Sequence, residues 1–250
     1  MKKKILYITY DSIEDSISKS QVLPLLERLS KSYDVYLISF EKNIINKKIL
    51  FIKKFEQVKY GKNKFSKFNS ILFCFFKVFF LVKKHNIQII HCRSYIPAII
   101  AYFIKKITKI KYIFDIRGLW FNEKLDAKLI SFFFFKILKK FEERLYNNSD
   151  SIITLSHKSI KFIRTEFKIN QKKITYVSCF TDIKKFSNSS TNIKNKLVFG
   201  YIGNVKLSYD FDKVLNFFEK FDTINKNWKL IFANNHLSEK ERKEIFSNFS

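Results

Sequence analysis

The chain has 250 residues, and its 48 Lys and Arg against 22 Asp and Glu give a formal net charge of +26. A hydrophobic content of 46% provides for a sizeable core and excludes global disorder. The four glycines form neither a G-x-G-x-x-G nor a G-x-x-x-x-G-K-[ST] pattern, so the ordinary dinucleotide-binding and P-loop fingerprints are absent.

Short apolar runs alternate with helical patterns over the first three quarters of the chain. The predicted strands are 4–10, 34–40, 49–58, 87–92, 111–116, 151–155 and 174–178. The predicted helices are 20–32, 66–85, 97–107, 126–146 and 157–168. Repeated strand–helix–strand units predict an α/β fold with a parallel, doubly wound sheet. Sheets of this kind bind ligands at the carboxyl ends of their strands.

The composition changes after residue 186. Residues 187–196 are polar and lack an apolar period, which indicates a linker. Beyond it we predict a strand, an amphipathic helix, a second strand and a charged helix, at 197–202, 211–221, 228–233 and 238–249. The prediction is therefore a complete Rossmann-like domain at 1–186 and an incomplete second Rossmann-like domain at 197–250.

Cysteine and histidine usage indicates neither a disulfide framework nor a metal site. The three cysteines are far apart and form no C-x-x-C pair, which favours a reducing compartment. None of the four histidines has a second ligand at zinc-like spacing, so no metal site is predicted.

The positive charge is concentrated in one region. Residues 51–113 hold fourteen Lys and Arg against a single acid, Glu56. A genome with AT-rich codons explains part of this excess, and local binding to anions or to a membrane surface explains its uneven spread. Nucleic acid is not an expected partner, because the chain has no RNA- or DNA-reading motif.

Two aromatic segments have two interpretations each. In 62–85, lysines surround a stretch rich in Phe; this helix either lies in a membrane interface or packs on the sheet with its lysines pointing outward. The apolar run within it, 71–82, is expected to be too short to span a bilayer. The same two interpretations apply to 129–146, which contains the run Phe132–Phe135.

Five segments, in order, resemble one family. They include a Ser-Gln-Val opening, an Asp-x-Arg-Gly-x-Trp segment, a Cys-containing segment that enters the linker, and a Gly-Tyr-x-Gly strand, and they fall at 6–29, 113–123, 142–156, 174–186 and 199–218. Together they resemble the GT-B glycosyltransferases, specifically the family 4-like sugar transferases of bacterial surface-polysaccharide pathways.

The resemblance implies two Rossmann-like domains that face each other across a cleft. The first would bind a glycan or lipid-linked acceptor, and the second a nucleotide-sugar. It implies a retaining hexosyltransferase without metal or cofactor, in surface polysaccharide or lipopolysaccharide synthesis. Its expected location is cytoplasmic and peripheral to the inner face of the membrane.

The resemblance also implies that the donor domain is truncated. In similar proteins this domain continues further and carries an E-x7-E segment that holds the donor. A separate polypeptide that completes the donor domain is therefore a predicted partner. The alternative hypothesis is a non-catalytic remnant that binds a membrane surface or a partner protein.

Asp115 and Arg117 are the predicted catalytic residues. They follow the strand 112–114, at the ligand end of the sheet. The carboxylate would orient a sugar hydroxyl, and the guanidinium would bind a phosphate or a carboxylated sugar. The alternative is a structural ion pair that holds the loop. His91 ends a neighbouring strand, at the same edge of the predicted cleft; it is interpreted as a core or loop histidine rather than a site residue.

The other predicted site residues bind substrate. Trp120 would stack on a sugar or pack in the core, and Glu123 would bind acceptor or cap the following helix. By resemblance, the loop 11–20 would cover the diphosphate, with Ser18 and Lys19 where relatives usually carry glycine.

In the second domain a diphosphate cradle is predicted. The backbone N–H groups of Gly203 and Asn204 would bind the anion at the start of the following helix. Lys206 would add a cation, unless it is an ordinary solvated lysine.

Overall fold

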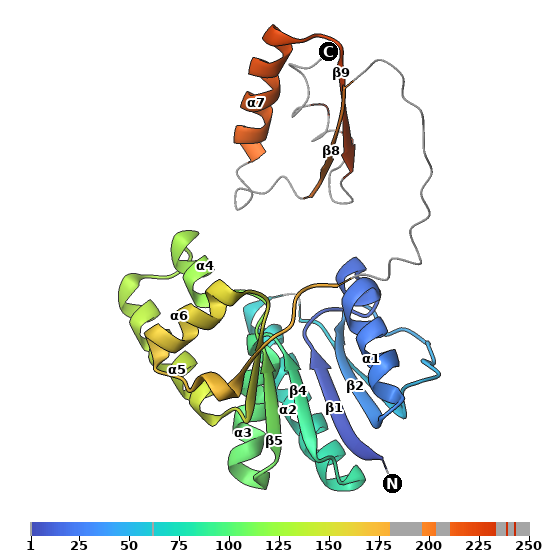
Figure 1. The fold of residues 1–250 in the computed structure, drawn as a ribbon. Helices are drawn as coiled ribbons and strands as arrows, with labels where there is room; N and C mark the ends of the chain where they lie inside the picture. The colour runs from blue at the N-terminus through green and yellow to red at the C-terminus, as the bar shows by residue number, and fades with distance from the viewer. Residues whose placement is uncertain are drawn as a thin grey trace. The chain divides into compact units, whose positions relative to one another are not determined.

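The computed structural model describes residues 2–61, 63–180, 197–203 and 211–233, together with Glu239 and Lys243 (Figure 1). The chain divides into two compact units, unit 1 (Met1–Ile183) and unit 2 (Lys184–Ser250). The predicted linker 187–196 lies outside the described residues, and so does the predicted helix 238–249 apart from Glu239 and Lys243.

Unit 1 contains a seven-stranded parallel sheet in the order β3-β2-β1-β4-β5-β6-β7. The strands are β1 (Lys3–Thr9), β2 (Tyr33–Glu41), β3 (Lys54–Lys59), β4 (Ile89–Arg93), β5 (Lys111–Asp115), β6 (Ser151–Thr154) and β7 (Ile174–Tyr176). The chain winds outward from β1 to β3, then crosses back and winds from β4 to β7. The order therefore reverses between β1 and β4, where a doubly wound sheet opens its ligand crevice.

Helices cover both faces of this sheet. They are the π-helical turn η1 (Ser18–Val22), α1 (Leu23–Ser30), α2 (Lys64–His85), α3 (Tyr95–Thr108), α4 (Trp120–Asp126), α5 (Phe132–Asn148), α6 (His157–Phe167) and the short 3-10 turn η2 (Gln171–Lys173). α1 packs on one face, over a small core that includes Tyr7, Leu26 and Leu37. α2, α3, α5 and α6 cover the other face over a larger core that includes Ile8 and Phe114.

Two predicted elements are wrong at their boundaries. β3 begins at Lys54 rather than at residue 49, because 49–52 form a turn in which the Ile52 N–H donates to the Ile49 carbonyl. The helix predicted at 126–146 begins six residues later, as α5 (Phe132–Asn148), and the short helix α4 (Trp120–Asp126) that precedes it was not predicted. The two helices are separated by a segment in which Lys128 has a left-handed φ of 54°, and α5 starts where the Ser131 side chain accepts the Phe134 N–H.

α2 is longer than its apolar run suggested. Within the described residues it is the one helix long and apolar enough to cross a membrane by length and composition, with a mean hydropathy of 1.6 over its best 18-residue window. Its face with Cys74, Val78 and Leu81 is nevertheless built into the core of unit 1. The sheet-packing interpretation of this segment is therefore correct for that face.

Unit 2 has a small described part. β8 (Leu197–Ile202) and β9 (Trp228–Ala233) pair in parallel, and α7 (Phe211–Ile224) packs on them. The rings of Phe218 and Trp228 stack at 5.0 Å between centroids, and Phe199 contacts both. Both predicted strands are confirmed, and the predicted helix extends to Ile224.

Candidate functional site

Polar side chains from neighbouring strands form one row at the carboxyl end of the unit 1 sheet. The strand register pairs Thr9 of β1 with Arg93 of β4, and Arg93 with Asp115 of β5. Residues opposite each other in a parallel sheet project from the same face, so the three side chains lie side by side. The row lies at the reversal of strand order, between β1 and β4, and is the candidate site.

Asp115 is the centre of the row. It is fully buried; its Oδ2 accepts a bond from Arg117 Nη2 at 2.5 Å and lies 3.3 Å from His91 Nε2. Burial alone would raise the pKa of this carboxyl, but the hydrogen bonds and charges of His91 and Arg117 hold the pKa below its ordinary value. Its Oδ1 has no hydrogen-bond partner among the described residues. The group is thus an ionised carboxylate with one oxygen unused.

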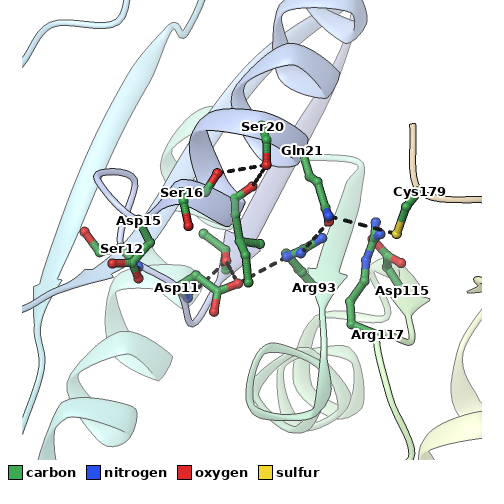
Figure 2. A network of polar contacts seen from close by, with 12 residues as sticks. Asp11, Ser12, Asp15, Ser16, Ser20, Gln21, Arg93, Asp115, Arg117 and Cys179 are labelled. Atoms are coloured by element: carbon green, nitrogen blue, oxygen red, sulfur yellow. Dashed lines mark hydrogen bonds and ion pairs between the residues drawn. The ribbon is translucent and has the colours of Figure 1, made fainter. Parts of the chain in front are cut away.

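Arg93 extends the network towards the first helix (Figure 2). Its side chain is 5% exposed; Nε donates to Asp11 Oδ2 at 3.1 Å, and Nη2 donates to Gln21 Oε1 at 2.9 Å. The Gln21 amide in turn reaches Cys179 Sγ at 3.9 Å. Gln21 lies in η1, and π-helical turns are frequent at functional sites.

The loop after β1 is hydrogen-bonded to Glu41, which ends β2. This buried carboxylate accepts the Ile13 N–H at 3.0 Å and the Ser39 hydroxyl at 2.5 Å, and Ser12 Oγ also bonds to it. The loop therefore has a fixed conformation beside the candidate site.

Ser18 and Lys19, predicted to cover a diphosphate, have other surroundings. Ser18 is fully buried in η1, and Lys19 Nζ pairs with Glu14 Oε2 at 2.8 Å. Hydrogen bonds from Lys19 and Lys47 lower the pKa of Glu14 to about 2, so this carboxylate stays charged beside Lys19. In this conformation Lys19 is already paired with a carboxylate, which it shares with Lys47.

A cavity of about 250 Å³ opens beside Asp115 and Arg117. Its polar lining comes from Gln21, His91, Asp115 and Arg117, and most of the remaining wall is apolar. α1 forms one side, and the segment 177–180, which follows β7 and runs towards α1 in Figure 1, forms the other. Asp115, Arg117 and His91 are thus brought to one concave site.

Trp120 and Glu123 lie away from this cavity lining. Trp120 begins α4, and its ring packs against Tyr95 and Phe121 with Lys124 Nζ 4.7 Å from its centroid. This packing supports the core interpretation of Trp120. Glu123 lies inside α4, in its first turn, and its side chain is exposed. The helix that was predicted to follow it, α5, is capped by Ser131 instead. Its Oε1 occupies the space that a side chain on Gly118 would need, 2.5 Å from an ideal Cβ.

The predicted cradle in unit 2 is described at one residue only. The Gly203 N–H donates to the Ala233 carbonyl at 3.3 Å, so it extends the β8–β9 pairing. Asn204 and Lys206 lie outside the described residues. In the part of the chain that the structure describes, no group of three or more His, Cys, Asp or Glu side chains is arranged to hold a metal ion.

Three contributors to the site were not among the predicted residues. Arg93 comes directly after the predicted strand 87–92, just as Asp115 comes directly after the strand 112–114. The rule that selected Asp115 therefore applies to Arg93 too. Gln21 belongs to the Ser-Gln-Val opening but was given no role. His91, interpreted as a core histidine, is buried as expected and also lines the cavity.

The fold and the site together define a Rossmann-like α/β domain with a ligand crevice where the strand order reverses. The model for Glycosyltransferase Family 4 matches residues 20–185, which is more than half of the chain. The chain belongs to this family. No curated protein sequence gives a significant match.

Solved structures support the same fold. Sucrose-phosphate synthase from Thermosynechococcus elongatus has a TM-score of 0.75 at 10% identity, over 99% of this chain and 68% of that one. HepE from Anabaena, in complex with UDP and glucose, has a TM-score of 0.63 at 11% identity, over 98% and 65%. The apo form of the lipopolysaccharide outer core galactosyltransferase WaaB has a TM-score of 0.57 at 15% identity, over 98% and 71%. The predicted GT-B fold class is confirmed, and the chain spans about two thirds of the length of these structures.

Proposed function

We propose that this chain acts as a retaining glycosyltransferase. It would move a sugar from a nucleotide-sugar to a glycan or lipid-linked acceptor in surface polysaccharide or lipopolysaccharide synthesis. The observation that carries the proposal is the buried Asp115 at the carboxyl end of β5, one strand away from the reversal of strand order, in a sheet of family 4. The complex of HepE with UDP and glucose and the name of WaaB support the donor and acceptor classes.

Unit 1 would hold the acceptor. Asp115 Oδ1 accepts the hydrogen bond of an acceptor hydroxyl and orients its oxygen for attack, since Oδ2 is already held by Arg117. Arg117 would serve the sugar side as well, because its Nε is a donor without a partner among the described residues. In unit 2, Gly203, Asn204 and Lys206 remain the proposed diphosphate contacts, although the Gly203 N–H would have to leave the Ala233 carbonyl. In unit 1, Lys19 would have to leave Glu14, and Ser18 would have to be uncovered, before either could contact the diphosphate.

Transfer is tested with the full chain. The assay follows release of UDP from UDP-glucose or UDP-galactose and labelling of an acceptor glycan. We expect Asp115→Asn to lower turnover by about 10²-fold or more, which is the range for a lost orienting group. Asp126→Asn, an exposed carboxylate at the end of α4, is the matched control. Equal activity of Asp115→Asn and the unaltered chain would contradict the assignment.

We also propose that α2 and the start of α5 dock on the inner face of the cytoplasmic membrane. Large apolar side chains are exposed there, namely Phe65, Phe68, Leu72, Phe73, Phe76 and Phe80 on α2 and Phe132, Phe133, Phe134 and Ile137 on α5. The basic surroundings, fourteen cations over 51–113, favour an anionic lipid surface as the occupant. Aromatic side chains next to lysines are typical of interfacial helices.

Sedimentation with vesicles tests this surface. The chain should sediment with phosphatidylglycerol vesicles and much less with phosphatidylcholine vesicles. The double variant Phe76→Ser, Phe80→Ser should lose the association, while Phe217→Ser, an exposed Phe of α7, should keep it. Vesicle binding without any sugar transfer would favour the non-catalytic alternative over the enzyme.

A further inference from the structure

The cavity of the candidate site is a slot that runs along the strands. Its floor includes Ile89 of β4 and, further along, Ile113 and Asp115 of β5, all on the sheet face that α1 covers in part. From the register position of Ile89 to that of Asp115 is four residues, or about 13 Å of strand. The slot is therefore elongated, with the polar Asp115 and Arg117 near the carboxyl end of the strands.

Away from its polar lining, which includes Ser178 as well as Gln21, His91, Asp115 and Arg117, the walls of the slot are mostly apolar. They come from the sheet, from α1 and from the segment 177–180, through the side chains of Ile5, Leu25, Leu29, Ile89, Ile113, Ile153, Val177 and Phe180. The segment 177–180 is held in place at both ends. The Val177 N–H donates to the Thr154 carbonyl at 3.0 Å, and the Arg28 guanidinium lies 5.7 Å from the centre of the Phe180 ring. These two contacts place the segment 177–180 beside the sheet and α1, and the three together enclose a mostly apolar slot.

The end of the slot with Asp115 and Arg117 indicates which chemical group of a ligand binds there. Asp115 Oδ1 is an unused acceptor and Arg117 Nε an unused donor, and both residues line the slot. The two arginines are already paired with carboxylates, Arg93 with Asp11 and Arg117 with Asp115. A sugar hydroxyl, which both donates and accepts, matches this end better than an additional anion.

We propose that the slot binds an amphiphilic acceptor: its sugar lies against Asp115 and Arg117, and its alkyl or isoprenoid chain lies along Ile113 and Ile89. This assignment rests on the proposed function, because it names the acceptor class of that site. It places the lipid part of the acceptor inside unit 1, on the face of the sheet that α1 covers. Since α2 lies on the other face, the lipid chain would have to leave the bilayer to enter the slot.

Calorimetric titration of the full chain with octyl glucoside and with methyl glucoside, both below the micelle concentration of the former, tests the proposal. Each buried methylene favours binding, so octyl glucoside should bind at least about tenfold more tightly. Ile113→Phe fills the slot and should remove this preference. Ile107→Phe, the same change at an exposed position of α3, should leave it unchanged. Ile153→Phe is the second slot variant, and a thermal melt verifies the fold of each.

Three results would overturn the slot. The first is equal affinity for the two glucosides. The second is unaltered octyl glucoside affinity in folded Ile113→Phe and Ile153→Phe. The third is no binding of octyl glucoside, which is the result expected if a polypeptide segment fills the slot. Sugar transfer that is equally efficient to tailed and tail-less acceptors would retain the transferase and reject the slot. Chain-length-dependent binding without transfer would support the slot and reject the transferase.

Discussion

Glu142 of α5 gives the sharpest stability prediction. Its carboxylate is fully buried; Oε1 accepts bonds from the hydroxyls of Tyr95 and Tyr146, and Oε2 pairs with Lys139 Nζ at 2.6 Å. Glu142→Gln keeps an oxygen for the two tyrosines but leaves Lys139, whose side chain is 13% exposed, without its counter-charge. Breaking a buried pair by removing one partner costs about 3–5 kcal/mol. Because the tyrosine bonds survive, we expect a loss of about 3 kcal/mol in the unfolding free energy of unit 1.

Urea unfolding followed by tryptophan fluorescence measures this loss. Trp120 lies in unit 1 and Trp228 in unit 2, so a Trp228→Phe background makes the signal report unit 1 alone. The expected loss corresponds to about 6–12 °C in melting temperature for a unit of this size. The exposed neighbour Glu143 is the control, and Glu143→Gln should stay within about 0.5 kcal/mol.

A loss below about 1 kcal/mol for Glu142→Gln would refute the reasoning, since that is the range of a surface pair. It would mean that Lys139 is satisfied without a carboxylate. The candidates would then be Asn122 Oδ1, which accepts from Nζ at 3.3 Å, and the aromatic rings around it, of which Phe167 is 4.2 Å from Nζ.

Three further predictions follow from single contacts. Asn63→Ala removes the side chain that accepts the Ser66 N–H at the start of α2, and urea titration should show a loss of about 1 kcal/mol. Glu41→Gln removes the charge that holds the loop after β1, so hydrogen exchange of the Ile13 amide should accelerate by about tenfold or more, and an unchanged rate would reject that role. The folded-state pKa of Asp115 is lowered, so its stabilisation is complete above the ordinary value of about 3.9 and is lost as the pH falls through the lower folded value. Unfolding free energies of the unaltered chain and Asp115→Asn should therefore converge as the pH falls below about 4, and a constant difference would contradict this assignment.

The sequence predicted the sheet well because its strands are apolar and lie between clear helical patterns. Asp115 and Arg117 were placed at a ligand-binding edge by one rule, that parallel sheets bind at their carboxyl ends. That rule needed no side-chain geometry, so it worked from the sequence alone. The roles of these residues in catalysis stay a prediction.

Features that depend on non-local packing could not be predicted. α4 begins at Trp120 after Leu119, which offers no side chain to cap the helix, so the sequence carries no start signal. Gln21 reaches Arg93 from a π-helical turn, and such a turn has no sequence pattern of its own. The environment of Lys19 depends on Glu14 and Lys47, which meet only in the folded loop.

The row formed by Thr9, Arg93 and Asp115 also constrains how the sheet assembles. A slip of one residue between neighbouring strands would turn each side chain to the opposite face. For β4 or β5, that face is the large core with Ile8 and Phe114, where an unpaired arginine or carboxylate is strongly unfavourable. The same charged side chains therefore help to specify the strand register, because burial of an unpaired charge makes the misaligned pairings less stable.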